Sequence, residues 1–489
     1  MSDTAAAAAT DTYPAGMTRV TLVWVAVGLV LFPILSILGL AMRALQAGLF
    51  AATPPEWFYA VMTLHGLGMV GVWFVAGLAA MSFVLSSYVR PSLAVSWIAL
   101  GMTVVGVVLL VAATLVGKLG VGWYFLYPLP FFSGGTWPAW ATSALFVALG
   151  MLGVGWTLWA GDVLRAIAGR YRMSEALGWH YLAGRSEPEV PPVIIIATVS
   201  CIGVLAGLVA AVVILLLIAW EVLGSGAASD ALLMKNLTFY FGHMIVNITM
   251  YFGVALVYAI MPAYTGRPWK TNSLVVISWN VVLALVMFAY LHHLYMDIAQ
   301  PRWVQVLGQL SSYLVSVPAA VVTIFSTLVL VYRSETRWSL APTLLYIGVM
   351  GWAIGGVAAM IDSTISVNQV FHNTLWVPAH FHTYYLMGVV LMILGAVHHL
   401  ATTLTSAPEN LKRSRIMAAH LVIGGYGFLL SLYLAGANSV PRRFAAYPMD
   451  GSSGPLFAGI SMLFIVLLFG GLGLYLWDTG RLCVRALRA

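Results

Sequence analysis

Charge is the scarcest property of this sequence, because Asp, Glu, Lys and Arg make up only 8% of its 489 residues while 62% are hydrophobic. A mean hydropathy of +0.96 excludes a water-soluble globular protein and indicates an integral membrane protein. The formal net charge of +7 reflects membrane topology, because Lys and Arg residues are concentrated in the loops expected on the inner side. It gives no reason to expect a nucleic-acid partner.

Cysteine is also nearly absent. Cys201 and Cys483 are the only two, and neither belongs to a C-x-x-C or C-x-x-C-H motif. Covalently attached heme c, an iron–sulfur cluster and a binuclear copper site built from thiolates are therefore excluded from this chain.

Long apolar runs fill most of the sequence. A helix needs about 20 apolar residues to cross a hydrocarbon core of roughly 30 Å. Runs of this kind predict an all-α bundle of twelve transmembrane helices, about 18–478, in a single domain that covers residues 1–489. The predicted spans are 18–42, 57–87, 93–117, 138–163, 192–222, 234–262, 273–296, 304–332, 341–364, 376–402, 416–436 and 456–478.

The positively charged residues predict how the bundle is oriented. The first 17 residues lack a basic segment, so no cleaved signal peptide is expected and the N-terminus is expected in the cytoplasm. Twelve spans then place six of the 22 Lys and Arg residues outside and the other sixteen inside, as the positive-inside rule requires. We therefore expect a multi-pass protein of the bacterial inner (plasma) membrane with both termini cytoplasmic. The six outer residues are Arg43, Lys118, Lys235, Arg302, Arg442 and Arg443.

Six histidines fall in the outer third of this predicted bundle. Four different spans carry them, and hydrocarbon would leave their ring nitrogens unpaired at a high cost in free energy. Imidazole is a common ligand of heme iron and copper, so the cluster predicts metal centres and not a proton relay or a set of core histidines. These residues are His65, His243, His292, His293, His380 and His382.

The spacing of His380 and His382 divides the ligands between two centres. Two residues correspond to about 200° around a helix, so the two rings face opposite sides and cannot share one metal. His382 can pair with His65 as the axial ligands of a low-spin heme, whose expected type is b. His380 can be the single protein ligand of a second, high-spin heme of b, o or a type.

A copper ion can occupy the space opposite that second heme. His243 would contribute from the sixth span, and the adjacent His292 and His293 from the end of the seventh. Three imidazoles without a carboxylate suit copper better than iron(II), which favours two histidines with a carboxylate.

These motifs resemble the catalytic subunit of the heme-copper oxidase superfamily over nearly the whole chain. The stretch from His372 to His382 is most similar to the B-type oxidases, whereas Thr265-Gly-Arg-Pro-Trp269 is similar to the C-type branch. The resemblance implies that Arg442, Arg443 and His372 lie near heme propionates, which guanidinium groups can bind. The alternative is that the two arginines are only surface charge and bind no ligand. The motifs that carry it are Leu64-His65-Gly66, Gly242-His243, His292-His293 and His372-Asn-Thr-Leu-Trp-Val-Pro-Ala-His-Phe-His382.

The sequence departs from the oxidase pattern at the tyrosine that oxygen-reducing members cross-link to a copper histidine. The A- and B-type position of that residue holds Asn247, and the C-type position holds Val286. Tyr251 and Tyr290 match neither position. In the best-known nitric oxide reductases of the superfamily the first position is a glutamate, which Asn247 is not either. We expect Asn247 to donate a hydrogen bond beside the substrate pocket.

Loss of the tyrosine affects oxygen chemistry more than nitric oxide chemistry. Cleaving O2 without releasing peroxide takes four electrons, whereas coupling two NO molecules to N2O and water takes two electrons and two protons. The first prediction is therefore a nitric oxide reductase related to the B-type oxidases. The alternatives are a terminal O2 reductase (cytochrome c or quinol oxidase, with or without proton pumping) and, remotely, a heme-free membrane transporter.

Two further groups of residues have predicted roles in proton or electron supply. A proton path from the cytoplasm is expected along Tyr258, Ser312, Tyr313 and Ser316, although such hydroxyls can instead bond the backbone four residues earlier. Asp362 and Glu221 could feed protons or bind an ion, or could be solvated helix ends. Because the chain has no covalent heme or thiolate copper centre, electrons must come from a further subunit, with cytochrome c or a copper-binding domain, or directly from quinol.

Overall fold

The computed structural model describes residues 14–225, 228–297 and 299–488, so the Ala- and Thr-rich start up to residue 13 lies outside the described part. Within that part, twelve helical segments are long and apolar enough to cross a membrane. No strand occurs there, and the one β-type contact is an isolated bridge between Thr374 and Pro441. The prediction of an all-α, twelve-helix membrane bundle is confirmed.

Six of the twelve described spans are single helices, and the other six continue without a break into turns of different pitch. The twelve spans and the short helices between them are α2 Ala15–Gln46; α3 Pro55–Leu85; α4 Leu93–Val111 with η1 Ala112–Val116; α5 Ala139–Ala168; α6 Met173–Ala176; α7 Trp179–Leu182; α8 Pro192–Trp220 with η2 Glu221–Ser225; α9 Ala231–Thr265; α10 Ser273–Ala289 with η3 Tyr290–Leu294; α11 Arg302–Ala320, η4 Val321–Phe325 and α12 Ser326–Val331; α13 Leu340–Asp362; α14 Ile365–Phe371; α15 Trp376–His382, η5 Thr383–Val390 and α16 Leu391–Thr405; α17 Leu411–Ala437; and α18 Gly454–Tyr475, η6 Leu476–Gly480 and α19 Arg481–Arg488.

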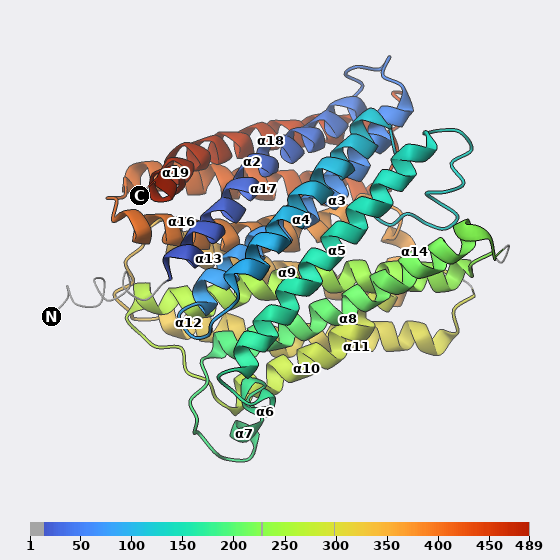
Figure 1. Ribbon diagram of the computed structural model, residues 1–489. Coiled ribbons are helices and arrows are strands. Elements are labelled where there is room, and N and C mark those ends of the chain that lie inside the picture. The colour runs from blue at the N-terminus through green and yellow to red at the C-terminus, as the bar shows by residue number, and fades with distance from the viewer. Residues whose placement is uncertain (1–13, 226–227, 298, 489) are drawn as a thin grey trace.

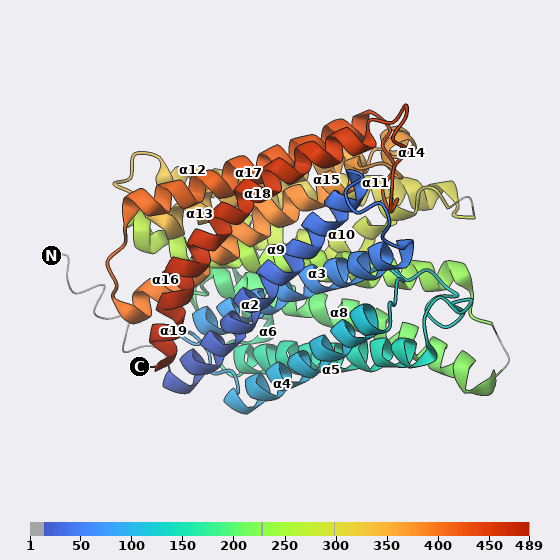
Figure 2. The same cartoon turned by 90° about the horizontal axis from the view of Figure 1, so that it is seen from above.

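Neighbours in sequence pack side by side in the bundle (Figures 1 and 2). The pairs α2 with α3, α4 with α5, α8 with α9, α10 with α11 and α17 with α18 are examples. In the most apolar stretch of α9 83% of residues are buried, and in the α15–α16 span 78%, against 22% in α2. The two spans that carry His243, His380 and His382 are therefore central, and other helices shield them from lipid.

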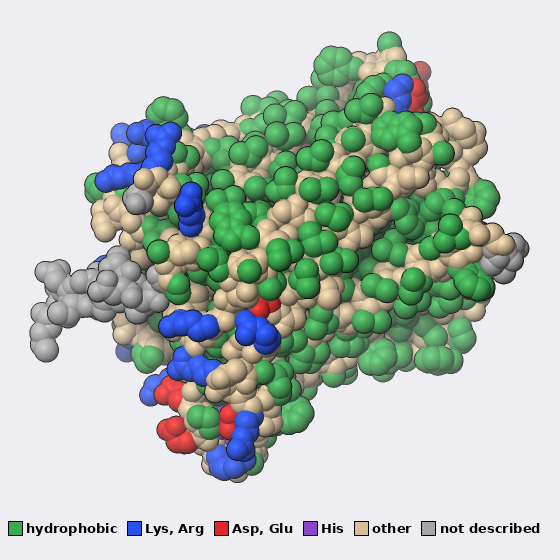
Figure 3. Space-filling model, in the orientation of Figure 1, with side chains coloured by type: hydrophobic (Ala, Val, Ile, Leu, Met, Phe, Trp, Pro, Cys, Tyr) green, Lys and Arg blue, Asp and Glu red, His purple; other side chains and the backbone are tan. Residues whose placement is uncertain are grey.

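The two ends of the bundle differ. We call the end where α2 finishes and α3 begins the histidine end, and the opposite end, where α2 begins and α19 finishes, the terminal end (Figure 1). Lys and Arg side chains gather at the terminal end, while hydrophobic side chains cover the face between the ends (Figure 3). Exposed apolar residues such as Ile34, Val209 and Leu463 mark the lipid-facing surface of a multi-pass membrane protein.

Candidate metal centres

The short helix α15 carries the two histidines of the tenth span. It begins at Trp376, whose ring stacks on Phe371 at 4.5 Å, and it passes at His382 into the wider turns of η5. Helix α17 fixes its position through Gly436, where an added Cβ would lie 2.2 Å from the backbone nitrogen of Trp376. Only glycine allows this approach, so the contact places His380 and His382 at the centre of the bundle.

His65 of α3 and His382 of α15 face each other with nearly parallel rings. Their ring centroids are 6.4 Å apart and the planes differ by 21°. Each Nδ1 atom lies next to a backbone carbonyl, Leu35 O at 2.8 Å for His65 and Pro378 O at 2.7 Å for His382. A carbonyl accepts only a proton donor, so each Nδ1 carries the proton and each Nε2 keeps a free lone pair.

This geometry fits one metal between the two rings. A ligating nitrogen lies about 2 Å from the metal and roughly 1 Å from its own ring centre, so two axial imidazoles have centroids about 6 Å apart. The carbonyl partners also provide the orientation that metal-bound histidines usually receive. The residues present therefore suit a bis-histidine heme.

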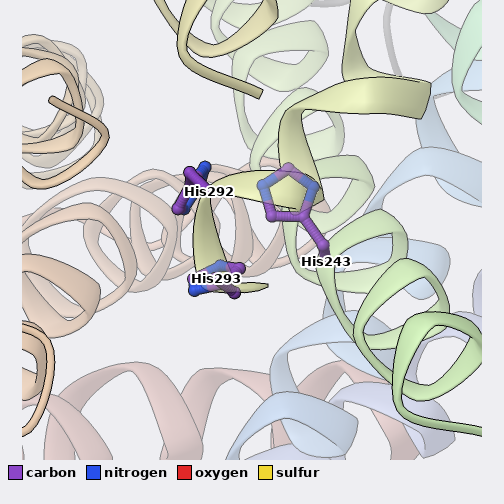
Figure 4. A group of neighbouring side chains, drawn as sticks. All are labelled: His243, His292 and His293. Atoms are coloured by element: carbon purple, nitrogen blue, oxygen red, sulfur yellow. The ribbon is translucent and has the colours of Figure 1, made fainter. Parts of the chain in front are cut away.

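His243, His292 and His293 form a second cluster. One ligand atom from each lies within 4.8 Å of the others. The ring centroids are 5.4 Å apart for His243 and His292, 5.6 Å for His243 and His293, and 4.0 Å for the adjacent pair. Figure 4 shows the three rings around one common space. The tight 3-10 turn η3 makes this possible, because it brings two consecutive side chains toward α9.

Ser312 of α11 holds one of these rings. Its Oγ lies 3.0 Å from His292 Nδ1 and donates its own proton to Gly308 O at 2.6 Å. The His292 Nδ1–H group is therefore the donor in the contact with Ser312. His292 Nε2 is buried and has no partner, and a lone pair in this state suits a metal.

Asn247 lies one turn beyond His243 on α9. Its Nδ2 atom is 2.8 Å from the His243 carbonyl and 3.2 Å from the nearer ring nitrogen, Nε2. The amide is thus held against the imidazole and lines the cavity described next. The donor role predicted for Asn247 is geometrically possible and stays a prediction.

A single cavity of about 780 Å³ connects both clusters. Its size is within the range of small-molecule and cofactor sites, and its lining is mostly apolar. His380 faces it from the side of α15 opposite His382, and its Nδ1 is buried without a partner. The predicted ligand residues that line it are His65, His243, His292, His293, His380 and His382.

Arg442, Arg443 and His372 close the cavity at the histidine end. The backbone N–H of Arg442 donates to Asn373 O at 2.9 Å, and the Arg443 guanidinium lies 3.8 Å from the centre of the Tyr124 ring. Arg442 Nε is buried and unpaired. The structure thus brings the three predicted propionate contacts together.

The electrostatics of this end favour an anion. Burial and the neighbouring Arg442 and Arg443 lower the pKa of His372 to about 3, so the ring is neutral. Burial, and to a smaller extent repulsion by the neighbouring Arg443 guanidinium, lower the pKa of Arg442 to about 9. Carboxylates placed here would relieve that repulsion, and heme propionates have the required charge.

The predicted proton-path residues bond several different partners in the described structure. Ser316 Oγ donates to Ser312 O at 3.0 Å, and the Tyr313 hydroxyl bonds Thr364 Oγ1. Tyr258 bonds Thr323 Oγ1 at 3.1 Å, and its ring stacks on Trp269. Ser316 thus bonds the backbone, as the alternative expectation held, and Ser312 is engaged with His292.

The two acids named from the sequence differ in environment. Glu221 accepts from the Tyr127 hydroxyl at 2.8 Å and from Ser229 N at 3.1 Å, so both of its oxygens bind the chain itself. Asp362 is buried and its Oδ1 has no partner. Its charge acts on Arg442, which places it at the propionate side of the cavity.

Two cavity residues were missed from the sequence. Helix α2 extends to Gln46, beyond the predicted end at residue 42, so Arg43 lies in the helix and not in a loop; its Nη1 is buried and unpaired. Trp123 lies against both Gly66 and Gly242, where an added Cβ would come within 3.5 Å and 2.7 Å of its side chain. In the sequence, the glycines next to His65 and His243 were the only indication that a large side chain packs there.

Comparison with known proteins identifies the family of this chain. A sequence model of the family described as cytochrome c and quinol oxidase polypeptide I matches residues 19–473. Cytochrome c oxidase subunit 1 of Thermus thermophilus is 24% identical over 447 residues, 84% of this chain and 75% of the relative. The Synechocystis protein of the same name is 23% identical over 415 residues, 81% and 71% of the two chains.

A solved structure shows the same fold. The cryo-EM structure of a heme-copper terminal oxidase dimer superposes with a TM-score of 0.78 at 19% sequence identity, and covers 96% of this chain and 84% of its own. Because the family match spans nearly all of the helices described above, the chain belongs to the cytochrome c and quinol oxidase polypeptide I family, the catalytic subunit I of heme-copper oxidases.

Proposed function

We propose that this chain is the catalytic subunit of a membrane nitric oxide reductase, which converts two NO, two electrons and two protons into N2O and water. The observation that carries the proposal is Asn247. It occupies the place, one turn beyond His243, where the resemblance puts the redox tyrosine of oxygen-reducing enzymes, and its amide contacts the His243 ring at 3.2 Å.

Neither Tyr251 nor Tyr290 takes the place of the missing tyrosine in the described structure. The Tyr251 ring packs against Trp279 with centroids 5.3 Å apart, and the Tyr290 hydroxyl donates to Asn236 at 3.3 Å. Both side chains are therefore committed elsewhere. Val286, at the other tyrosine position, is a fully buried aliphatic residue.

The roles of the other residues follow from their positions. We assign His65 and His382 to a low-spin heme, His380 to a high-spin heme, and the three-histidine cluster to one copper ion. When bound, the high-spin heme and the copper would together supply the two electrons that NO coupling consumes. The protein would hold the ligand rings, keep the cavity apolar, and offer the Asn247 amide as a hydrogen-bond donor to NO in the cavity.

We also propose the setting of the enzyme. The gathering of Lys and Arg at the terminal end (Figure 3) supports a bacterial plasma membrane with that end in the cytoplasm. Electrons would then reach the low-spin heme at the histidine end, from a subunit with cytochrome c or a copper-binding domain or from quinol. The whole chain, 1–489, is proposed to be one domain.

Oxygen reduction is the second candidate, and the names of the relatives favour it. The Thermus and Synechocystis proteins are both called cytochrome c oxidase subunit 1. The two candidates share every metal ligand. They differ in whether the reaction needs the redox tyrosine, whose place Asn247 occupies.

Paired turnover measurements on the purified complex test the proposal. We expect N2O formation from NO to be much faster than O2 consumption, and no His–Tyr cross-link in peptides that contain His243. Replacement of Asn247 by Tyr should lower NO turnover by filling the pocket and raise O2 turnover only modestly. The variant Asn247→Leu, which keeps the volume and removes the amide, separates the two effects. Fast cyanide-sensitive O2 consumption with negligible N2O would refute the proposal and establish the oxidase.

A further inference from the structure

The last span extends beyond the thickness of the membrane core and ends in a positively charged segment. Gly454–Arg488 is one continuous helical segment of 35 residues, made of α18, η6 and α19. Residues 454–477 carry no charge, and at about 1.5 Å per residue they span roughly 36 Å, more than a hydrocarbon core of roughly 30 Å. The turns after Trp477 therefore lie at the level of the lipid headgroups, at the terminal end.

One side of these turns collects an aromatic ring and three arginines. The four residues follow one another at intervals of three or four positions, which places them on one face of the helix. All four are exposed, and they are Trp477, Arg481, Arg485 and Arg488. The Arg481 guanidinium lies 4.8 Å from the centre of the Trp477 ring. An aromatic ring next to basic side chains is typical of the interface between membrane and water.

The other side of α19 is packed against the bundle. Cys483 is buried there, and Leu482, Ala486 and Leu487 contact the hydrophobic core. The neighbours of α19 are α16 and α2. The end of the span is therefore held in place, and its arginines point away from the protein.

Helix α17 adds positive charge at the same level. Arg413 Nε lies 2.5 Å from Asp478 Oδ2, so the first turn of α17 lies beside η6. Figure 3 shows Lys and Arg side chains gathered over the region that Figure 1 labels α19. We use the name cationic cluster for the exposed residues Lys412, Arg415, Arg481, Arg485 and Arg488.

The cationic cluster has no acidic partner in the described structure. Asp478 is the only acid in residues 454–488, and it is paired with Arg413. None of the ion pairs among the described residues includes a member of the cluster. Its charge is therefore available to an anion from outside the chain.

A second basic region at this end differs in this respect. Arg165 pairs with Asp162 at 2.6 Å, and Arg90 donates from Nη1 to the carbonyl of Ser86 at 2.7 Å. These guanidiniums already have partners within the chain. The cationic cluster is thus the better anion site of the two.

The face that carries Trp477 continues into the membrane as an apolar surface. Leu463 and Val466 lie on the same line of α18 and are 72% and 59% exposed. A molecule that matches the whole face is anionic at one end and apolar along the rest. A soluble anion would contact the cationic end alone.

We propose that this surface binds an anionic phospholipid. The cationic cluster holds the headgroup phosphate, to which guanidiniums donate paired hydrogen bonds, and the acyl chains lie along Leu463 and Val466. The Trp477 ring lies at the border between the two parts. Neither part depends on the gas that the enzyme reduces, so the inference stands apart from the proposed function.

Lipid titration of the purified complex, delipidated in detergent, tests the proposal. The probes are phosphatidylglycerol, zwitterionic phosphatidylcholine and inorganic phosphate, and bound lipid is counted by native mass spectrometry. In the test variants Arg481, Arg485 and Arg488 are replaced together, by Gln in one variant and by Lys in the other. The matched control also removes three exposed positive charges at the terminal end, through Arg185→Gln, Lys270→Gln and Arg333→Gln.

The unaltered complex should bind phosphatidylglycerol about ten-fold more tightly than phosphatidylcholine, and inorganic phosphate should not displace the lipid. The Gln variant should lose about ten-fold or more of this affinity, because each basic residue at the surface adds to the attraction. The Lys variant and the control should keep most of it. Added salt should weaken binding, because exposed charges are screened.

Three results would overturn the inference. The first is equal affinity for phosphatidylglycerol in the Gln variant and the control, since the cluster would then have no role. The second is displacement of the lipid by inorganic phosphate, which would make the site one for a soluble anion. The third is equal loss in the Lys and Gln variants, which would mean that the packing of α19, and not its charge, determines binding.

Discussion

At the scale of single residues, the side chains two positions apart on α15 serve opposite sides of the helix. His382 faces His65 at a centroid distance of 6.4 Å, while His380 faces the part of the cavity shared with the three-histidine cluster. The angular argument from residue spacing and the observed geometry agree. Which metal each ring binds remains a proposal, and substitution can test it.

His65→Ala and His382→Ala should each abolish the low-spin heme signal and leave the high-spin heme in place. His380→Ala should remove the high-spin heme and leave the low-spin signal, because the His380 ring is not part of the His65–His382 pair. Optical and electron paramagnetic resonance spectra of the purified variants measure both outcomes. An unchanged low-spin spectrum in His65→Ala would end the assignment.

Ser312 offers a second test at this scale. Ser312→Ala removes the acceptor of His292 Nδ1–H, and loss of such a partner typically weakens metal binding about 10- to 100-fold. We expect lower copper retention on dialysis against a chelator, with normal heme content. The neighbouring Ser311→Ala is the control, because the Ser311 hydroxyl bonds only the carbonyls of Leu307 and Gly308. Equal copper loss in both variants would show that the ring is not held through Ser312.

The contact of Ser312 with His292 shows where inference from the sequence stops. The serine stood out as a polar residue inside an apolar run and suggested a proton path. Its actual partner depends on how α10 and α11 pack, which residue spacing within one helix does not reveal. Arg43 was missed for a related reason, because its position relative to the cavity depends on where α2 ends.

At the scale of elements, the sequence was sufficient for the spans and insufficient for their irregular turns. Apolar length alone located all twelve crossings, since each must bridge the same hydrocarbon thickness. The short helix α14 and the changes of pitch at η3 and η5 were not predicted. These turns set the direction of His292, His293 and His382, yet their composition is no different from that of the surrounding helix.

The contact between α15 and α17 gives a prediction for these elements. Gly436→Ala would place a Cβ 2.2 Å from the backbone of Trp376, so α15 would have to move and both of its histidines with it. We expect less heme of both kinds per protein and lower thermal stability. Gly459→Ala, on α18 in open space, is the control and should leave heme content unchanged. Normal heme content in Gly436→Ala would mean that α15 tolerates the shift.

At the scale of the whole molecule, family membership and fold agree with what the motifs predicted, and a heme-free transporter finds no support. The family implies hemes and copper, and we propose their number from the arrangement of the histidines. Metal analysis should find about one copper for every two hemes, apart from copper in partner subunits, and no non-heme iron. Stoichiometric non-heme iron with no copper in this chain would overturn the proposed cluster.

The hydrogen bonds of His65 and His382 to backbone carbonyls have a consequence for biogenesis. Both acceptors, Leu35 O and Pro378 O, belong to the chain itself, so the backbone of α2 orients the His65 ring and the backbone of α15 orients the His382 ring. Insertion of heme can then follow membrane integration as a late assembly step, with little ordering of side chains left to complete. A maturation factor would have to deliver the porphyrin without having to remodel the apoprotein around it.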